Sequence, residues 1–347
     1  MSSPTPTPQI EERFQQRRLH AQAVCRTPEV TSDNASIVYN TSISSSGRLR
    51  FGDLRICLIP KVGSTFLGQL FKAFVESNQK PNKKTKGRRL TEAVFVREPY
   101  GRLLSGYFNK GLLRPSRFPK LGKWIMTFSG VMDPSLKWYE KCSVSATFPE
   151  FVRYFILSEN TGKGRNEHFV PIHDQCWMCT GNYTYIGHLE TIREDLEYML
   201  RSVNISVSLN SEEEKKRGFL IGAKFILESE QRYVDKCKNA DNFTMLKTLW
   251  LSYHVRGLIH DRIDFPLTES QCEFVDKEDF ADLASDAMKK SKGKFSSKDQ
   301  KMKYLRKYYQ EVPLADRLAL RNIFRRDFQL SGYDPEPSYI FPEFSNT

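Results

Sequence analysis

One segment of the sequence, residues 54–74, constrains the fold more than any other. Residues 54–59 are mostly apolar and predict a short buried strand that ends at Pro60. The apolar residues that follow have the spacing of one helical face: Leu67, Leu70, Phe71 and Phe74. The segment therefore predicts a strand, a tight turn and a helix in succession.

The turn itself, Pro60–Thr65, has the composition of an anion-binding site. The first N–H groups of a helix lack partners within the helix, and the helix dipole adds partial positive charge there. Gly63 lets the backbone approach a ligand closely, and Lys61 adds a full charge. Ser64 and Thr65 add hydroxyls that can also cap the helix. The spacing of a Walker A loop is absent. Taken alone, the turn is better interpreted as an ordinary capped turn with a surface lysine.

The pattern of strand, turn and helix then repeats. Residues 93–96 predict a second strand, and Pro99 suits the first position of the helix that follows. Residues 183–186 predict a third strand, and residues 314–330 predict a last helix that ends at Gly332. This alternation predicts an α/β fold, with a P-loop-like parallel sheet flanked by helices and with extra helical segments.

Capping boxes predict two further helix starts. Thr147 with Glu150 forms one such box, and Thr191 with Glu194 forms the other. In each pair we expect the threonine hydroxyl to accept from the backbone N–H of the glutamate, which would fix where the helix begins.

Three residues after the second strand predict a second anion site. Arg97 follows the strand directly, and Arg102 and Ser105 lie on the helix after it. An arginine binds phosphate as a bidentate fork, and serine adds a neutral donor. A surface pair of Arg97 with Glu98 is the plain alternative. Two anion sites at neighbouring strand ends imply a ligand with two separated phosphate groups, of which PAPS (3′-phosphoadenylyl sulfate) is one.

Composition and charge limit the class of protein. The chain of 347 residues carries a net charge of +12, so its surface should attract polyanions. We expect a flexible stem over residues 1–50 and a domain over 51–335, followed by a tail over 336–347. The charged stretch 204–300 is expected to be a variable insertion that contains helices.

The compartment signals point in two directions. The N-terminus lacks the apolar segment of a signal peptide, and no run of 18 apolar residues occurs. Seven cysteines are compatible with disulfides. Five Asn-x-Ser/Thr sequons favour glycosylation in the secretory pathway: Asn34, Asn40, Asn182, Asn204 and Asn242.

Five separated blocks, in the same order, resemble the Golgi carbohydrate sulfotransferases. The most similar group contains the HNK-1, chondroitin 4-O- and dermatan 4-O-sulfotransferases. The blocks are Ile59–Thr65, Phe95–Ser105, Asn166–Pro171, Cys176–Thr191 and Asp327–Tyr333. Members of that family normally carry an N-terminal membrane anchor, which is missing from this sequence.

The resemblance implies the fold of the PAPS-dependent sulfotransferases and in-line transfer of a sulfuryl group from PAPS to a glycan hydroxyl. The acceptor would be a chondroitin, dermatan or glycoprotein glycan, in the Golgi lumen or at the Golgi membrane. Neither a metal nor nucleic acid is expected to take part. The donor-binding residues that it implies are Pro60, Lys61, Val62, Gly63, Ser64, Thr65, Phe66, Arg97, Arg102 and Ser105.

Two residues are candidates for the catalytic groups. Lys61 would stabilise the charge that develops on the leaving phosphate. His168 is the first candidate for the general base, because an unperturbed imidazole titrates near neutrality; a structural role is the alternative. Glu98 is a second candidate base, although beside Arg97 an ion-pair or capping role is favoured. His173 and His188 are expected to satisfy local hydrogen bonds.

Several alternatives stay open at this stage. Cys176 and Cys179 could begin a zinc site, but a second pair is missing and disulfides are favoured. The basic loop Lys80–Arg89 could hold an anionic glycan or could be a solvated loop. The alternative functions are a phosphotransferase of P-loop type and a glycan-binding lectin that has kept the fold without activity.

Overall fold

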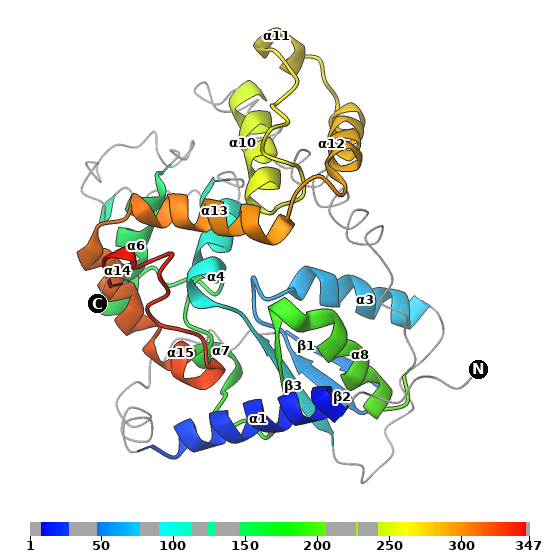
Figure 1. The fold of residues 1–347 in the computed structure, drawn as a ribbon, viewed down its shortest axis with the longest axis vertical. Helices are drawn as coiled ribbons and strands as arrows, with labels where there is room; N and C mark the ends of the chain where they lie inside the picture. Colours follow the sequence, from blue (N-terminus) through cyan, green and yellow to red (C-terminus); the bar gives the residue numbers. More distant parts are fainter. Residues whose placement is uncertain are drawn as a thin grey trace. The chain divides into compact units, whose positions relative to one another are not determined.

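The structure is a computed structural model that describes most of the chain, namely residues 8–27, 47–76, 90–112, 124–125, 127–128, 146–205, 227 and 242–344. The predicted basic loop and the sequons at Asn34 and Asn40 lie outside these residues. The chain forms two compact units that interleave along the sequence (Figure 1). The first, here the sheet unit, draws on Met1–Arg102, Arg165–Ser211 and Asn322–Pro335. The second, the helical unit, draws on Leu103–Gly164, Glu212–Arg321 and Glu336–Thr347.

The sheet unit contains a four-stranded sheet in the order β1-β2-β3-β4. Its strands are β1 (Arg48–Phe51), β2 (Leu54–Cys57), β3 (Thr91–Val96) and β4 (Tyr183–His188). The pairs β2–β3 and β3–β4 are parallel, which confirms the predicted α/β fold and its three strands. Strand β1, which was not predicted, pairs antiparallel with β2 across a tight turn in which Gly52 has φ 57°. The parallel strands bring the ends of β2, β3 and β4 to one edge of the sheet.

Helices surround this sheet. They are α1 (Pro8–Cys25), α3 (Ser64–Glu76), α7 (His173–Cys176), α8 (Ile192–Ser202) and α15 (Arg325–Ser331), together with the start of α4 (Pro99–Gly106). Helix α3 contacts β1, whereas α1 and α8 contact β4 (Figure 1). The predicted apolar face of α3 packs as expected, with Leu67 and Phe74 buried in the core.

Helix α1 differs from the exposed stem expected over residues 1–50. Its Phe14 and Ala21 are buried at 3% and 4% exposure. A disulfide joins Cys25, at its end, to Cys179, and Arg13 and Arg17 pair with the buried Asp195. Phe14 and Ala21 belong to the hydrophobic core, but polar and charged residues dominate the sequence of α1, which is why its packing was not predicted. Residues 8–25 are therefore part of the sheet unit.

One of the two predicted capping boxes forms. Thr147 and Glu150 make both reciprocal hydrogen bonds at the start of α6 (Phe148–Thr161). At the start of α8, Thr191 makes no capping bond, and its hydroxyl instead donates to Asp195 Oδ2 at 2.7 Å. The predicted helix start at Thr191 is therefore confirmed, but its capping box is wrong, because a buried carboxylate one turn further on accepts the hydroxyl.

The helical unit begins within α4 and continues into a π-helical turn, Tyr107–Leu112. Its other helices are α6, α10 (Asn242–Val255), α11 (Glu269–Cys272), α12 (Lys277–Ser291), α13 (Ser297–Gln310) and α14 (Leu314–Ile323). Helices in the charged stretch were expected, and Trp250, Tyr253 and Phe280 form part of their buried core.

The single last helix predicted over residues 314–330 is wrong. The structure has two helices, α14 and α15, with Phe324 between them at φ −88° and ψ 5°. Its ring is buried and contacts Phe328 in the sheet unit. Gly332 ends α15 with a left-handed φ of 72°, as predicted.

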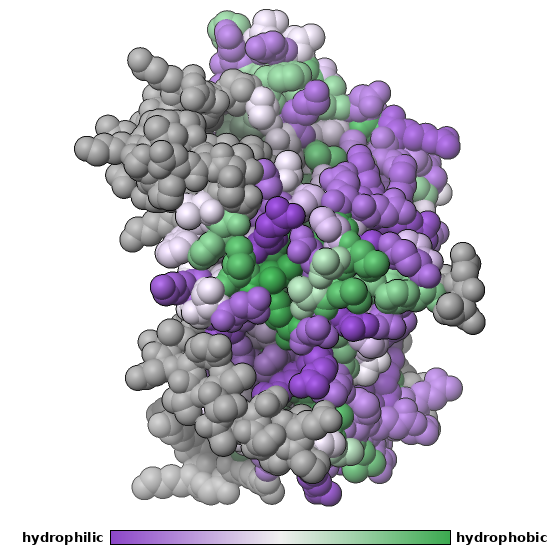
Figure 2. Space-filling view, turned by 90° about the vertical axis from the view of Figure 1, so that its left-hand side faces the viewer, coloured by the Kyte–Doolittle hydropathy of each residue, from purple (hydrophilic) through white to green (hydrophobic). Residues whose placement is uncertain are grey.

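Charged residues make up 27% of the chain, and the described surface is accordingly hydrophilic over much of the face that is shown (Figure 2). Figure 2 shows one face, on which hydrophilic residues cover much of the described surface and hydrophobic side chains are exposed between them. Among the described residues, no helix combines the length and the apolar character needed to cross a membrane.

Candidate functional site

The predicted anion-binding turn connects β2 to α3. The N–H of Val62 donates to the carbonyl of Ile59 at 3.3 Å, and the side chains of both residues are buried. Lys61, which lies between these two residues, has φ 70°, and Gly63, which precedes the helix, has φ 76°. Both values are in the left-handed region. A lysine rarely adopts this conformation, and such backbone is held in place only by its surroundings. The turn places the start of α3 at the edge of the sheet where the parallel strands end.

A side chain at Gly63 would be strained by its left-handed φ of 76° and would displace neighbouring side chains. A Cβ atom at this position would lie 2.7 Å from Ile192 Cδ1 and 3.3 Å from Leu189 Cδ1. The turn is thus packed directly against the residues that lead into α8. Of the predicted donor-binding residues, Val62 is buried in the core and Phe66 is partly buried against it.

Arg97 lies beside the first turn, as the sequence predicted. Its Nη1 donates to the carbonyl oxygen of Lys61 at 3.0 Å. Because β2 and β3 are adjacent and parallel, the residues that follow them meet at the same edge. Lys61 and Arg97, which are far apart in sequence, therefore place two cationic side chains at one location.

Arg102 makes contacts that the sequence did not predict. Its side chain is only 1% exposed, with Nε donating to Pro60 O at 3.1 Å and Nη1 donating to Val170 O at 2.7 Å. Arg102 thereby links the anion-binding turn to the segment that carries His168. Its phosphate contact stays a prediction. Ser105 lies further along α4 in the helical unit, and its phosphate contact stays a prediction.

His168 is oriented by Asn166. The Asn166 Oδ1 atom accepts the backbone N–H of His168 at 3.0 Å, so this oxygen faces the ring. The same oxygen lies 2.8 Å from His168 Nδ1, which must therefore carry a proton. In the neutral imidazole the lone pair is then on Nε2, the tautomer that a general base needs at that atom.

Glu98 caps α4. Its two carboxylate oxygens accept the N–H groups of Tyr100 at 2.9 Å and of Gly101 at 2.5 Å. Burial raises the pKa of Glu98 to about 7, against the opposing effects of these hydrogen bonds and of Arg97. Of the two roles weighed for Glu98, the structure favours the capping one.

A second group of residues at this edge was not predicted as part of the site. Glu190 follows β4, and its Oε2 accepts the hydroxyl of Tyr333 at 2.5 Å. Burial and the charge of Glu190 raise the pKa of Tyr333. The rule that polar residues at parallel strand ends gather at one edge could have identified Glu190. Tyr333 could not be identified in this way, because it follows the end of α15, far away in the sequence.

His188, at the end of β4, stacks on Tyr333 with ring centroids 4.8 Å apart. The expected local hydrogen bond of its side chain is absent, since Nε2 is buried without a partner among the described residues. Burial, reinforced by the charge of Arg17, lowers the pKa of His188 to about 4. His188 is therefore neutral at physiological pH and packs as an aromatic ring.

His173 has a structural role, as expected. Its Nδ1 and its backbone N–H both lie within 2.9 Å of Asp327 Oδ1, and Ile172 N donates to the other oxygen. Burial lowers the pKa of His173, but the hydrogen bond and charge of Asp327 outweigh it, and the net shift is upward. Asp327 therefore holds the start of α7 in place.

The cysteine pair Cys176 and Cys179 does not form a zinc site. Cys176 is joined to Cys57, at the end of β2, and Cys179 is joined to Cys25. Within the described ranges, no group of three or more His, Cys, Asp or Glu side chains is arranged to hold a metal ion. The disulfides with distant partners, one of the two alternatives weighed from the sequence, are the ones that form.

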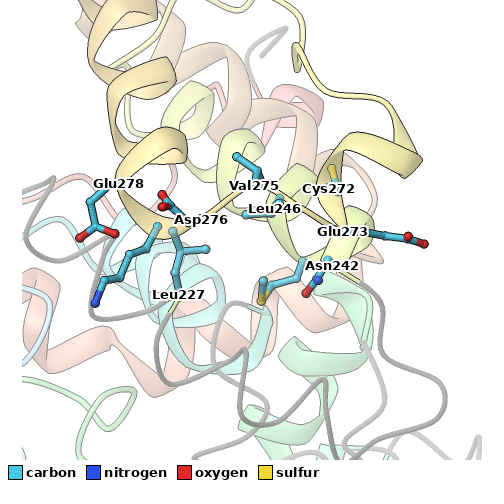
Figure 3. Close-up of a pocket in the computed structure, with 10 residues that line it drawn as sticks. Leu227, Asn242, Leu246, Cys272, Glu273, Val275, Asp276 and Glu278 are labelled. Atoms are coloured by element: carbon cyan, nitrogen blue, oxygen red, sulfur yellow. The ribbon is translucent and has the colours of Figure 1, made fainter.

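A separate cavity of about 530 Å³ lies within the helical unit, between α10 and the residues that connect α11 to α12 (Figure 3). Its lining combines apolar side chains with a charged rim of Glu273, Asp276, Lys277 and Glu278. None of the residues predicted to bind the donor or to act in catalysis lines it.

Comparison with known proteins agrees with this arrangement. The sequence model of a family described as the sulfotransferase family matches residues 52–226. This range contains the anion-binding turn, Arg97, His168 and Glu190. No solved structure matches the chain significantly.

The relatives that the chain matches are named carbohydrate sulfotransferases. Carbohydrate sulfotransferase 14 of Danio rerio is 27% identical over 189 residues, which cover 53% of this chain and 46% of the relative. Its Homo sapiens counterpart is 32% identical over 111 residues, 32% of this chain and 28% of the relative. Carbohydrate sulfotransferase 12 of Mus musculus is 28% identical over 135 residues, 37% of this chain and 32% of the relative. The matched region spans less than half the length of each relative.

Proposed function

The chain belongs to the sulfotransferase family, and from this premise we propose that it transfers a sulfuryl group from PAPS to a hydroxyl of a glycan. The relatives are named carbohydrate sulfotransferases, which supports a sugar as the acceptor. The glycan class that we favour is chondroitin, dermatan or a glycoprotein glycan, and the net charge of +12 suits such anionic chains.

The single observation that carries the proposal is the adjacency of Lys61 and Arg97 after the ends of β2 and β3, beside a turn that Arg102 links to the segment of His168. Arg97 bonds the carbonyl of Lys61, and Arg102 joins Pro60 to Val170, two residues beyond His168. The left-handed backbone at Lys61 and Gly63 forms the turn that leads into α3, and the first N–H groups of a helix are suited to bind an anion. These features suit a ligand that carries anionic groups close to a reacting hydroxyl.

In the proposed reaction, the acceptor hydroxyl attacks sulfur in line with the bond to the 5′-phosphate. The new bond joins the acceptor oxygen to sulfur, and the bond from sulfur to the bridging phosphate oxygen breaks. The released phosphate takes the electron pair, and Lys61 with the N–H groups at the start of α3 would stabilise its charge. The hydroxyl proton would pass to His168 Nε2, the ring nitrogen that carries the lone pair when Nδ1 is protonated.

The two disulfides support a location in the oxidising lumen of the secretory pathway, which includes the Golgi. Attachment to the Golgi membrane is an expectation that rests on the family.

The test is transfer of labelled sulfate from PAPS to a panel of acceptors, combined with calorimetric binding of the product nucleotide PAP. The panel contains chondroitin, dermatan and glycans that end in N-acetylgalactosamine or glucuronic acid. We expect Lys61→Ala and Arg97→Ala each to abolish transfer and to weaken PAP binding. Lys72→Ala is the matched control, because Lys72 is an exposed lysine on α3 whose ion pair with Glu76 lies on the surface.

The same measurements separate the alternatives. Unchanged transfer by folded Lys61→Ala protein would contradict the proposal. Binding of ATP with Mg²⁺ but not PAP would indicate a phosphotransferase. Retention of chondroitin without turnover would indicate a lectin.

A further inference from the structure

The asparagines of three of the five sequons are described residues, and the structure distinguishes between them. They begin at Asn182, Asn204 and Asn242, each followed two positions later by serine or threonine. The two disulfides favour an oxidising compartment, and the secretory pathway is also where N-linked glycans are attached. We propose that Asn182 and Asn204 carry N-linked glycans, that both glycans lie at the sheet edge opposite the anion-binding turn, and that Asn242 carries none.

Asn182 is exposed at the start of β4. The next residue, Tyr183, is buried and bonds the carbonyl of Cys176 through its hydroxyl, so the backbone is held while the Asn182 side chain faces solvent. Because β4 runs parallel to β2 and β3, its first residues lie at the edge where those strands begin. Lys61 and Arg97 follow the opposite ends of the strands.

Asn204 is exposed just beyond the end of α8, with φ 60°. Its N–H donates to Arg201 O at 3.0 Å, and the N–H of Ile205 donates to Leu200 O at 2.9 Å. The buried Ile205 lies against the β1–β2 turn, since its Cδ1 is 3.4 Å from where a Cβ of Gly52 would be. That turn precedes β2, so Asn204 shares the edge of Asn182, and a glycan there leaves the anion-binding turn open.

Asn242 has a different environment in the helical unit. Its amide oxygen is buried without a hydrogen-bond partner among the described residues. The side chain lines the cavity of about 530 Å³ together with Met245 and Leu246 (Figure 3). A glycan attached here would place sugar hydroxyls against apolar side chains, and polar groups buried without partners are costly.

Site mapping by mass spectrometry tests the proposal. The full chain is directed into the endoplasmic reticulum of cultured mammalian cells, and its glycans are removed by peptide N-glycosidase in heavy-oxygen water. This enzyme converts each occupied asparagine into a mass-labelled aspartate. We expect the label at Asn182 and Asn204 and none at Asn242. An unlabelled Asn182 or Asn204, or a labelled Asn242, overturns the assignment.

Sequon variants provide the second measurement. Asn182→Gln and Asn204→Gln should each remove one glycan step in electrophoretic mobility, whereas Asn242→Gln should remove none. Thr184→Ser keeps the Asn182 sequon and should keep the glycan, and Thr184→Ala should lose it. Thr184→Ala removes the sequon without changing Asn182. A glycan step that survives in this variant would therefore contradict the assignment even if Asn182→Gln folds poorly. Sulfate transfer by Asn182→Gln should equal that of the unsubstituted protein.

Discussion

Arg17 Nη1 lies 2.8 Å from Asp195 Oδ2, and this ion pair joins the N-terminal helix to the start of α8. Asp195 is fully buried, and the same oxygen accepts the N–H of His188 and the hydroxyl of Thr191. The residues beside Thr191 pack against Gly63 of the anion-binding turn. Helix α1 is thereby connected to the turn through one buried carboxylate.

We therefore expect Asp195→Asn to weaken both the fold and donor binding. The substitution removes the charge partner of Arg17 and leaves Arg13 paired only with the exposed Glu194, which should cost roughly 3 kcal/mol of unfolding free energy. PAP affinity should fall by about tenfold, which corresponds to 1.4 kcal/mol. Calorimetry and thermal unfolding measure the two effects. Gln15→Ala, at an exposed position of α1, is the control and should change neither. Lower stability with unchanged PAP affinity would show that Asp195 does not position the turn.

Removal of the Cys25–Cys179 disulfide should release the end of α1. The bridge spans 154 residues, but the Cys57–Cys176 disulfide lies inside this span and shortens the loop that it closes. In the chain-entropy model, Cys25→Ser should then cost about 4 kcal/mol of stability. Thermal unfolding without reductant measures this loss, and the double variant with Cys179→Ser should lose no more than the single one. A difference of less than about 1 kcal/mol from the parent protein would contradict the role of the bridge.

Gly63→Ala should damage the donor site through the backbone. The left-handed φ of 76° costs a non-glycine residue roughly 1 kcal/mol, and the added Cβ would meet Ile192 at 2.7 Å. We expect weaker PAP binding and lower sulfate transfer. Gly68→Ala, five residues later within α3, is the matched control because its Cβ would meet no atom within 4 Å. It should stabilise the protein by about 0.5–1 kcal/mol and leave PAP binding unchanged. Equal effects of the two substitutions would exclude a special role for the turn.

His168→Gln should lower kcat by about 10²–10⁴-fold while PAP affinity stays unchanged, if His168 is the general base. Asn166→Ala should also lower kcat, by a smaller factor, since the ring loses the partner of Nδ1 but keeps its lone pair. Steady-state kinetics with saturating PAPS provide the measurement. A parent-like kcat in His168→Gln would assign the histidine a structural role.

Glu98 should make stability depend on pH. Its pKa of about 7 in the folded protein lies above the ordinary value of 4.5. A carboxyl with a raised pKa contributes stability that is complete below pH 4.5 and is lost as pH rises through 7. Between these limits the parent protein should lose about 3 kcal/mol more than Glu98→Gln, which cannot ionise. Denaturant unfolding at a series of pH values compares the two, and parallel curves would contradict the assignment.

Local patterns in the sequence were sufficient for the central fold and half of the site. The strand predicted at residues 54–59, the helix α3 and the turn at Gly63 each depend on residues that are close together in the sequence. These local patterns predicted the parallel strands, the turn and the adjacency of Lys61 and Arg97, because strand ends in a parallel sheet meet at one edge. The motif order then identified the family, which the family model confirms.

What the tertiary structure decided rests on partners that are distant in sequence. The sequence predicted Arg102 as a phosphate ligand but could not predict that its guanidinium donates to the carbonyl groups of Pro60 and Val170. Helix α1 looked like a stem because its attachment depends on Asp195 and Cys179, more than 150 residues away. The sequence by itself determined which segments form the anion-binding turn, since backbone conformation is local. Burial and long-range pairing are not local, so only the folded chain decided which charged residues support that turn.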